Sequence, residues 1–381
     1  MLKRFRVQNF KSILDVEVRL SPVTVLAGVS GSGKTNLLQS FDLLHYLITG
    51  EPASWFKGVT PNSAVFRPGG GAVNEAFKSR FDLSFEAPDS IGQFTYNLEV
   101  AFHHTAVEPV AELLKAAASD RPLFAWRNGK WSHKPAVDTA NSRNHPSKLR
   151  WLTAIDEANI AYLTLGKGIA VYEFSNGVLT GGQSQRADGT LTRDGSNAAE
   201  VLRAIMENLN TLPRWRSIEE TMKILAPSIV SMARSPHKNN ELLLTTKFND
   251  ADIDLTLSQQ SDGFRRALAH LLAIYQVTTP QMVIFEEPDD GISPNLLPLL
   301  MHHMQSASAA FGTQFLLTTH SPDLVKCMPV DAIRWVQMTE KGTQILSITE
   351  GELPSLLANL TGVDQPDPPT VAAPATNEAV D

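Results

Sequence analysis

The most constraining feature of this chain is an eight-residue pattern at 28–35, GVSGSGKT, which matches G-x-x-x-x-G-K-[ST]. Glycines let successive backbone N–H groups converge on phosphate oxygens, and a following helix offers its positive N-terminus to the same anion. Lys34 is expected to reach the β- and γ-phosphates of a nucleotide, and the Thr35 hydroxyl to bind Mg²⁺. This loop alone does not distinguish kinases, GTPases and motor ATPases. The expected nucleotide-binding residues are Gly28, Ser30, Gly31, Ser32, Gly33, Lys34, Thr35 and Asn36.

The residues around this pattern predict a strand, a loop and a helix in sequence. Residues 1–27 alternate apolar and polar positions, which predicts strands, and residues 34–48 have apolar side chains at helical spacing. Residues 81–103 predict a β-hairpin or meander. The alternative for 28–35, a glycine-rich turn with an incidental Lys-Thr, does not explain why the pattern lies where a strand meets a helix.

The rest of the chain predicts an α/β fold. Segments 110–118, 196–209 and 217–230 are predicted to be helical, and 120–150 reads as polar loop. From residue 255 onward a helix, a buried strand, a helix and a second buried strand alternate, which favours a parallel sheet covered on both faces. The segment 364–381 has four acidic residues, no basic ones and four prolines, and is predicted to be a disordered tail.

Composition excludes several classes of protein. A formal net charge of −7 means that any contact with nucleic acid must come from a local patch. Cys327 is the one cysteine, which rules out an internal disulfide and a cysteine-built zinc site. The N-terminus lacks a signal-peptide core, and no apolar run approaches the length of a membrane helix, so we expect no membrane contact and a cytoplasmic location.

Two carboxylates end the first buried strand of the C-terminal third, in Met282-Val-Ile-Phe-Glu-Glu-Pro. At that place one carboxylate of the pair, Glu286 and Glu287, is suited to hold the hydration shell of Mg²⁺, and the other to accept a proton from an attacking water. The alternative for Glu286 and Glu287 is that they are two ordinary surface glutamates without a role in catalysis. His320 ends the next strand, where a histidine can bridge the γ-phosphate and the attacking water. The alternative is that His320 has only a structural role.

Ser261 and Gly263 open the long helix that precedes these strands. A serine hydroxyl and a glycine amide at a helix N-terminus form an anion site, but Ser261 is equally explained as an ordinary N-cap. The stretch 257–260, LSQQ, offers a competing alignment as the start of an LSGGQ motif.

In combination these blocks resemble the ABC-type ATPases of the RecF and SMC-like branch. More narrowly they resemble predicted "AAA family ATPases" of prokaryotic phage-defence and toxin–antitoxin loci, related to the ATPase half of OLD-family nucleases. The opening 7–12, VQNFKS, and the segment 191–197, LTRDGSN, are similar to recurrent elements of that group. The resemblance covers about residues 1–350.

The resemblance implies roles for the site residues. Residues 28–35 are the Walker A loop, Glu286 stands at the Walker B aspartate, Glu287 is the catalytic glutamate and His320 the switch histidine. Ser261 and Gly263 stand in the signature motif, which contacts the γ-phosphate of ATP held by the opposite subunit. The implied assembly is a homodimer with ATP sandwiched at its interface, with a higher oligomer left open. Residues 290–293 occupy the D-loop, and the Q-loop glutamine has no assigned position.

We expect an ATPase head made of 1–103 and 251–350, with 104–250 inserted as a largely helical lid or partner region. Seven Lys or Arg lie between 121 and 150, beside Trp126, Trp131 and Trp151. These residues either contact nucleic acid or form a solvated loop with the tryptophans packed inward.

Glu350-Gly351 resembles the start of a TOPRIM nuclease module, but we expect no room for one in the remaining residues. The leading hypothesis is therefore an ATP-hydrolysing dimeric switch that regulates a separately encoded effector in antiviral defence or toxin control. The alternatives are a RecF-like DNA-repair or DNA-sensing ATPase and a scaffold that holds ATP with little turnover. The presence of both Glu287 and His320 argues against the scaffold.

Overall fold

The computed structural model describes residues 1–57, 59–65, 77–87, 92–135, 145–175, 179, 190–234, 242–248 and 251–361. Its centre is a six-stranded sheet with the order β16-β15-β3-β14-β13-β9. Five of these strands are parallel, and only β16 runs antiparallel to its neighbour. The strands are β3 (Val23–Ala27), β9 (Ile169–Tyr172), β13 (Met282–Phe285), β14 (Gln314–Thr319), β15 (Ile333–Thr339) and β16 (Gly342–Ser347).

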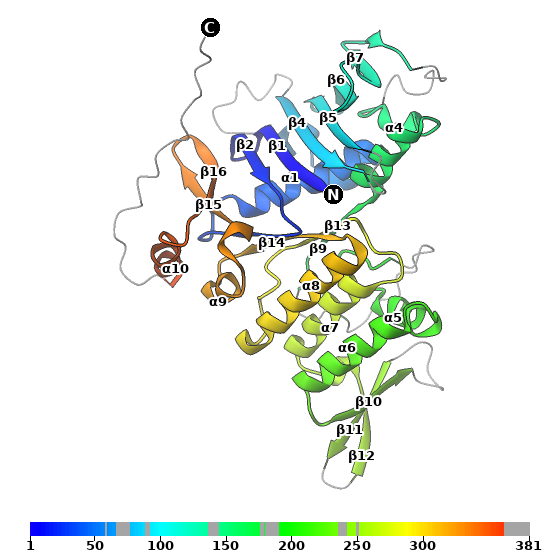
Figure 1. The fold of residues 1–381 in the computed structure, drawn as a ribbon, viewed down its shortest axis with the longest axis vertical. Coiled ribbons are helices and arrows are strands. Elements are labelled where there is room, and N and C mark those ends of the chain that lie inside the picture. The colour runs from blue at the N-terminus through cyan, green and yellow to red at the C-terminus, as the bar shows by residue number, and fades with distance from the viewer. Residues whose placement is uncertain are drawn as a thin grey trace.

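Both faces of this sheet are covered, as its continuously apolar strands predict. Val25, Phe285 and Leu317 point into one hydrophobic core, whereas Leu26, Ile284 and Leu316 point into the other. Figure 1 shows α5 to α8 on one side of the sheet and α1, with a second sheet, on the other. These helices are α1 (Lys34–Thr49), α5 (Ala198–Glu207), α6 (Leu212–Leu225), α7 (Asp262–Tyr275) and α8 (Leu297–Phe311).

The second sheet is antiparallel and seven-stranded, with the order β2-β1-β4-β5-β6-β7-β8. Its apolar face packs on α1, where the rings of Phe5 and Phe41 stack 3.7 Å apart. The predicted strands in 1–27 and the meander in 81–103 are confirmed. The strands are β1 (Leu2–Phe10), β2 (Ile13–Arg19), β4 (Phe77–Glu86), β5 (Gln93–Phe102), β6 (Val107–Ala116), β7 (Phe124–Arg127) and β8 (Lys130–His133).

The prediction of a helix over 110–118 is wrong, because this segment forms most of β6. Nine of the ten residues of β6 pair with β5, with Leu98 opposite Glu112. The Glu112 carboxylate is buried and accepts hydrogen bonds from the Tyr96 hydroxyl (2.8 Å) and the Ser147 hydroxyl (2.7 Å). Ladder pairing and this buried network therefore override the helical propensity of VAELLKAAA.

The prediction of loop throughout 120–150 is also wrong. β7 and β8 form a hairpin whose turn is Asn128-Gly129, both with positive φ (46° and 82°). Asn-Gly is the sequence signal for such a two-residue turn, and it was available in the sequence. Because β6, β7 and β8 extend the sheet that begins with β1, the sheet continues across residue 103.

The expected lid is helical only in part. Helices α5 and α6 confirm the predictions around 196–209 and 217–225, but residues 229–230 belong to a strand. β10 (Ile229–Arg234), β11 (Leu242–Phe248) and β12 (Ala251–Thr256) form a small antiparallel sheet at the end of the molecule next to α6 (Figure 1). The shorter helices are α2 (Pro52–Phe56), α3 (Pro61–Val65), α4 (Asp156–Ala161), α9 (Pro322–Lys326) and α10 (Leu353–Thr361). The predicted disordered tail, 364–381, lies outside the described residues.

Candidate active site

The loop 28–33 joins β3 to α1 and is fixed by close backbone contacts. The Gly28 amide donates to the Thr319 carbonyl (3.3 Å), and a Cβ on Gly28 would lie 2.2 Å from the Val336 carbonyl oxygen. Gly33 has φ +101°, and a Cβ there would lie 2.0 Å from the Thr343 hydroxyl oxygen. Only glycine fits at these two positions, which agrees with the spacing in the sequence pattern.

A network of hydroxyl groups lies beside the end of this loop that leads into α1. The Ser12 hydroxyl lies 2.6 Å from that of Thr343 and accepts a hydrogen bond from the Asn36 side chain (2.7 Å). The Thr343 amide in turn donates to the Ser12 carbonyl (2.9 Å). Asn36 thus contacts Ser12 in the turn after β1, and Ser12 in turn contacts Thr343 of β16, a residue that no sequence pattern indicated.

The Lys34 side chain is almost completely buried and folds back over the loop. Its ammonium donates to the carbonyls of Gly28 (2.7 Å) and Val29 (3.0 Å). Burial lowers the pKa of Lys34, and the carboxylates of Glu287, Asp289 and Glu286 oppose this effect. A cation that is held inside the loop by neutral carbonyls is poised to exchange them for phosphate oxygens.

Glu286 lies where the end of β13 meets the start of α1. The Thr35 hydroxyl donates to its Oε1 atom at 2.6 Å, so these two residues, 251 positions apart in sequence, are in direct contact. Burial raises the pKa of Glu286, the bond from Thr35 lowers it, and the nearby carboxylate of Glu173 raises it further. Glu173 follows the last residue of β9, the strand beside β13, and the sequence reading missed it.

Glu287 and His320 form the second pair. The Nδ1 atom of His320 lies 3.0 Å from Oε1 of Glu287, and both side chains are partly exposed. Glu287 has φ +45°, a left-handed conformation that is rare for a residue with a side chain. Its backbone amide donates to the Thr318 hydroxyl (3.1 Å). Non-glycine residues in this conformation cluster at active sites, where surrounding contacts hold them in place.

A further carboxylate, Asp289, also approaches this pair, and the sequence reading did not include it. Burial raises its pKa, while the Thr319 hydroxyl and the charge of His320 lower it. Its Oδ1 atom is buried and has no hydrogen-bond partner within the part of the chain described.

Ser261 is the N-cap of α7, and its hydroxyl accepts a hydrogen bond from the Phe264 amide (3.3 Å). The competing segment, Leu257–Gln259, is a separate 3₁₀ turn closed by its own capping box. A Cβ on Gly263 would lie 2.8 Å from the Gly291 carbonyl oxygen, so the start of α7 packs closely on residues 290–293. Ser261 and Gly263 thus lie at the start of α7, and their role in a signature motif stays a prediction.

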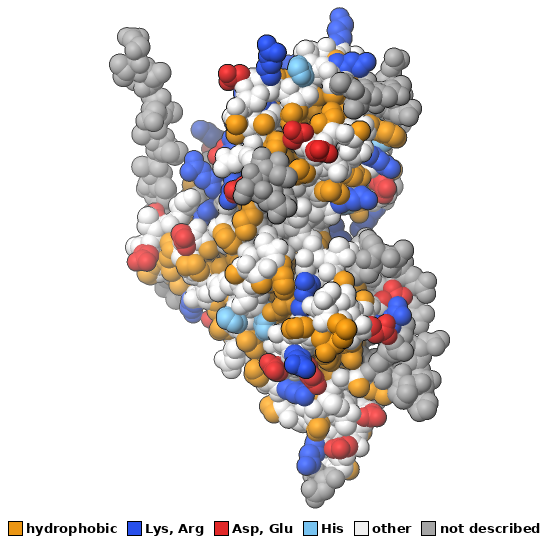
Figure 2. All heavy atoms as spheres, turned by 45° about the vertical axis from the view of Figure 1, so that its right-hand side comes forward, with side chains coloured by type: hydrophobic (Ala, Val, Ile, Leu, Met, Phe, Trp, Pro, Cys, Tyr) orange, Lys and Arg blue, Asp and Glu red, His pale blue; other side chains and the backbone are white. Residues whose placement is uncertain are grey.

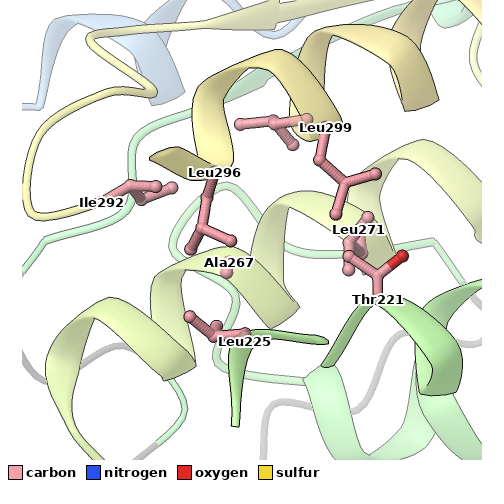
Figure 3. A pocket seen from close by; sticks show the side chains of 8 residues that line it. Thr221, Leu225, Ala267, Leu271, Ile292, Leu296 and Leu299 are labelled. Carbon is pink, nitrogen blue, oxygen red and sulfur yellow. The ribbon is translucent and has the colours of Figure 1, made fainter. Parts of the chain in front are cut away.

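An arginine ties the same two segments together. Arg266, in the second turn of α7, donates to the carbonyl (2.8 Å) and the carboxylate (3.0 Å) of Asp290. Figure 3 shows the neighbouring Ile292 and Leu296 above a small apolar pocket of about 20 Å³, between α6, α7 and the start of α8. Its remaining lining is Thr221, Leu225, Ala267, Leu271, Leu299 and Leu300.

The segment 191–197 connects the helical side of the molecule to α1. Arg193 donates to the Asp42 carboxylate of α1 (2.6 Å) and lies 3.4 Å from Glu173. The Asn197 side chain accepts from the Thr192 amide (2.7 Å), which fixes the turn. This explains the polar residues of LTRDGSN as an internal brace.

The aromatic residues near the basic stretch are not uniformly exposed. Trp126 is 8% exposed, and the Lys148 ammonium lies over its ring at 4.5 Å. Arg127, Lys130 and Lys134 are exposed on or beside the hairpin. On the face drawn in Figure 2, Lys and Arg side chains are spread among acidic and hydrophobic ones along the length of the molecule.

The residues around the loop fit Mg-ATP. The Ser32 hydroxyl oxygen is buried and has no partner among the described groups, and it lies inside the glycine loop beside Gly28. The Thr35 hydroxyl and Glu286 carboxylate form the all-oxygen pair that Mg²⁺ prefers. A phosphate-binding loop with an orphaned hydroxyl and an adjacent oxygen pair is suited to a nucleotide with its metal.

Comparison with known proteins supports this assignment. A family model described as "AAA domain, putative AbiEii toxin, Type IV TA system" matches residues 173–326. The chain is 22% identical to an OLD nuclease of Thermus scotoductus over 94% of its own length and 66% of that protein. It is 29% identical to the Nod factor export ATP-binding protein I of Rhizobium meliloti over 30% of each chain. The chain thus spans less than two thirds of either relative.

Two solved structures share the fold. A SmcHead bound to the C-winged helix domain of ScpA has a TM-score of 0.56, with 14% identity over 92% of this chain and 98% of that one. An Smc head domain with an extended coiled coil, bound to the C-terminal domain of ScpA derived from Pyrococcus furiosus, has a TM-score of 0.53, with 12% identity over 94% and 99%.

None of the helices in the described ranges has the length and apolar character that crossing a membrane requires. By these comparisons the chain has the fold of an ABC-type ATPase head and resembles the RecF and SMC-like branch, with an OLD-family protein among its relatives.

Proposed function

We propose that this protein binds Mg-ATP and hydrolyses it slowly as a dimeric switch. The observation that carries the proposal is the convergence of three short contacts at the carboxyl ends of adjacent parallel strands. Lys34 folds over the loop after β3, Thr35 contacts Glu286 at the end of β13, and Glu287 contacts His320 after β14. Carboxyl ends of neighbouring strands are where open α/β sheets bind their ligands.

In this proposal each side chain has a distinct task. Lys34 binds the β- and γ-phosphates, and Thr35 with Glu286 holds Mg²⁺, which when bound neutralises charge on the phosphate oxygens. Glu287 accepts a proton from the attacking water as general base. His320, whose ring contacts Glu287, orients the water and the γ-phosphate. The 3.0 Å contact between Glu287 and His320 allows both to reach one water molecule.

The second part of the proposal is that Ser261 and Gly263 serve the ATP of a partner copy in a head-to-tail homodimer. The start of α7 is exposed at Ser261 and Asp262, and the N-terminus of a helix favours an anion. Arg266 and Asp290 join this helix start to the segment that follows the catalytic glutamate. A movement of the start of α7 would therefore displace residues 290–293, and the reverse also holds.

Mixing two inactive variants tests the shared site. Ser261→Arg puts a bulky cation at the proposed interface, and Lys34→Ala disables the phosphate loop. In a mixed dimer the two defects meet at one nucleotide, and the other site has neither. We expect activity to return, to about half the wild-type rate per dimer if the sites act independently, and to less if they act as one unit. ATPase assays on purified heterodimers measure this.

Both parent variants must first be folded and inactive. If verified heterodimers stay as inactive as their parents and trap no ATP, Ser261 does not act in trans. ATP trapped at one site without turnover would instead mean that both sites must fire together.

We further propose that the switch regulates an effector encoded separately, in antiviral defence or toxin–antitoxin control. Support comes from the matching family model, described as a putative AbiEii toxin of a type IV toxin–antitoxin system, and from the relative named OLD nuclease. Co-purification from the native locus, followed by an assay of the partner's nuclease or toxin activity with and without ATP, tests it. An effector indifferent to ATP would contradict it.

A RecF-like DNA-sensing ATPase is the second candidate, favoured by the exposed cations of the β7–β8 hairpin. Charge reversal at Lys130 and Lys134 should weaken binding of DNA or RNA and flatten its salt dependence, because fewer counterions are released. Fluorescence anisotropy at several salt concentrations measures both effects. The buried position of Trp126 limits base stacking, so we expect cations to dominate. Absence of binding by the wild-type protein at low salt would leave the hairpin as a partner site or a solvated surface.

A further inference from the structure

Two adjacent threonines, Thr318 and Thr319, end strand β14 and are fully buried, at 1% and 0% exposure. The three residues before them, Phe315, Leu316 and Leu317, are apolar and equally buried. A buried hydroxyl costs free energy unless it is hydrogen-bonded, so two in a row at the end of an apolar strand require partners.

The partners are two backbone amides. One belongs to Glu287, a proposed catalytic residue, and the other to Ser321, which follows the second proposed catalytic residue, His320. The Thr318 hydroxyl accepts from the amide of Glu287 (3.1 Å), the residue with φ +45°. The Thr319 hydroxyl accepts from the amide of Ser321 (2.9 Å) and so closes the turn that carries His320. The Glu287 carboxylate and the His320 ring then meet at 3.0 Å.

We propose that the hydroxyls of Thr318 and Thr319 are positioning groups for hydrolysis: Thr318 holds the backbone of Glu287, and Thr319 holds the turn of His320. This inference rests on the proposed ATPase function and adds residues that act through the catalytic pair without touching ATP. It implies that turnover depends on two hydroxyls that ATP binding does not need.

Isosteric substitution tests the inference. Thr318→Val and Thr319→Val keep the shape and remove the hydroxyl, whereas Thr318→Ser and Thr319→Ser keep the hydroxyl. We expect each valine variant to lose about 10- to 100-fold in kcat, since a displacement of about 1 Å costs up to that much. The Kd for ATP should be unchanged, and the serine variants should recover most of the loss.

Thr24→Val is the matched control. Thr24 is buried at 0% exposure in the neighbouring strand β3, and its hydroxyl accepts from the Ser21 amide (2.9 Å) at the opposite end of the sheet. Its kcat should stay at the wild-type value, and thermal unfolding of all variants separates misfolding from mispositioning.

The outcomes are distinguishable. A wild-type protein that binds ATP and does not hydrolyse it overturns the proposed function and this inference together. If the wild type hydrolyses ATP and the folded valine variants keep its kcat, the inference alone is overturned. An equal loss in the serine and valine variants, or a loss in Kd that accounts for the whole effect, would also overturn it.

Discussion

Glu287→Gln is expected to stop ATP turnover and to leave ATP bound. The amide keeps the shape of the carboxylate but cannot accept the proton of the attacking water, and general-base catalysis contributes about 100- to 10,000-fold. The variant should accumulate as an ATP-stabilised dimer, because closure no longer leads to hydrolysis. Multiple-turnover assays measure the rate, and light scattering with and without ATP measures the dimer.

Glu220→Gln is the matched control, because Glu220 is an exposed carboxylate on α6, away from the site. Full turnover in Glu287→Gln would mean that another residue activates the water, and Glu286 would be tested first. A wild-type rate as low as that of the variant would favour the alternative of an ATP-bound scaffold.

Lys34→Ala is expected to remove ATP binding. The Lys34 ammonium is the buried cation of the phosphate loop, and hydrogen bonds to charged groups are worth about 1.5–3 kcal/mol each. Loss of its bonds to the β- and γ-phosphates should weaken affinity at least about 100-fold on that basis. Isothermal titration with Mg-ATP measures the change.

The control for this variant is Lys247→Ala, which removes an exposed lysine on β11. Because Lys34 also bonds the carbonyls of Gly28 and Val29, thermal unfolding must show that the variant remains folded. Unchanged affinity in a folded variant would contradict the assignment of 28–35 as the phosphate-binding loop.

The sequence by itself determined the local chemistry. The pattern at 28–35 predicted a strand–loop–helix arrangement, which is confirmed, and Gly28 and Gly33 occupy positions where a Cβ would collide. The continuously apolar runs before Glu286 and His320 predicted buried parallel strands, which are confirmed as β13 and β14. These features were readable because each depends on residues a few positions apart.

Local propensity failed where partners distant in sequence decided the outcome. Residues 110–118 have a helical pattern, yet most of β6 is built from them. This happens because they pair with β5 and because the buried Glu112 carboxylate accepts hydrogen bonds from buried donors. The Asn128-Gly129 turn was a readable signal that was overlooked. A weak helical propensity of a few tenths of a kcal/mol per residue cannot compete with a complete set of strand hydrogen bonds.

Only the tertiary structure revealed the residues that support the site. Ser12 and Thr343 are 331 positions apart, and Arg193 and Asp42 are 151 apart, yet each pair is in hydrogen-bond contact. In the sequence Thr318 is an ordinary strand residue, and only the fold places its hydroxyl next to the Glu287 amide. The sequence therefore determined which groups can perform the chemistry. Which groups hold them was decided by the order of strands in the sheet, since strand neighbours are chosen by burial of the whole core and no local pattern encodes them.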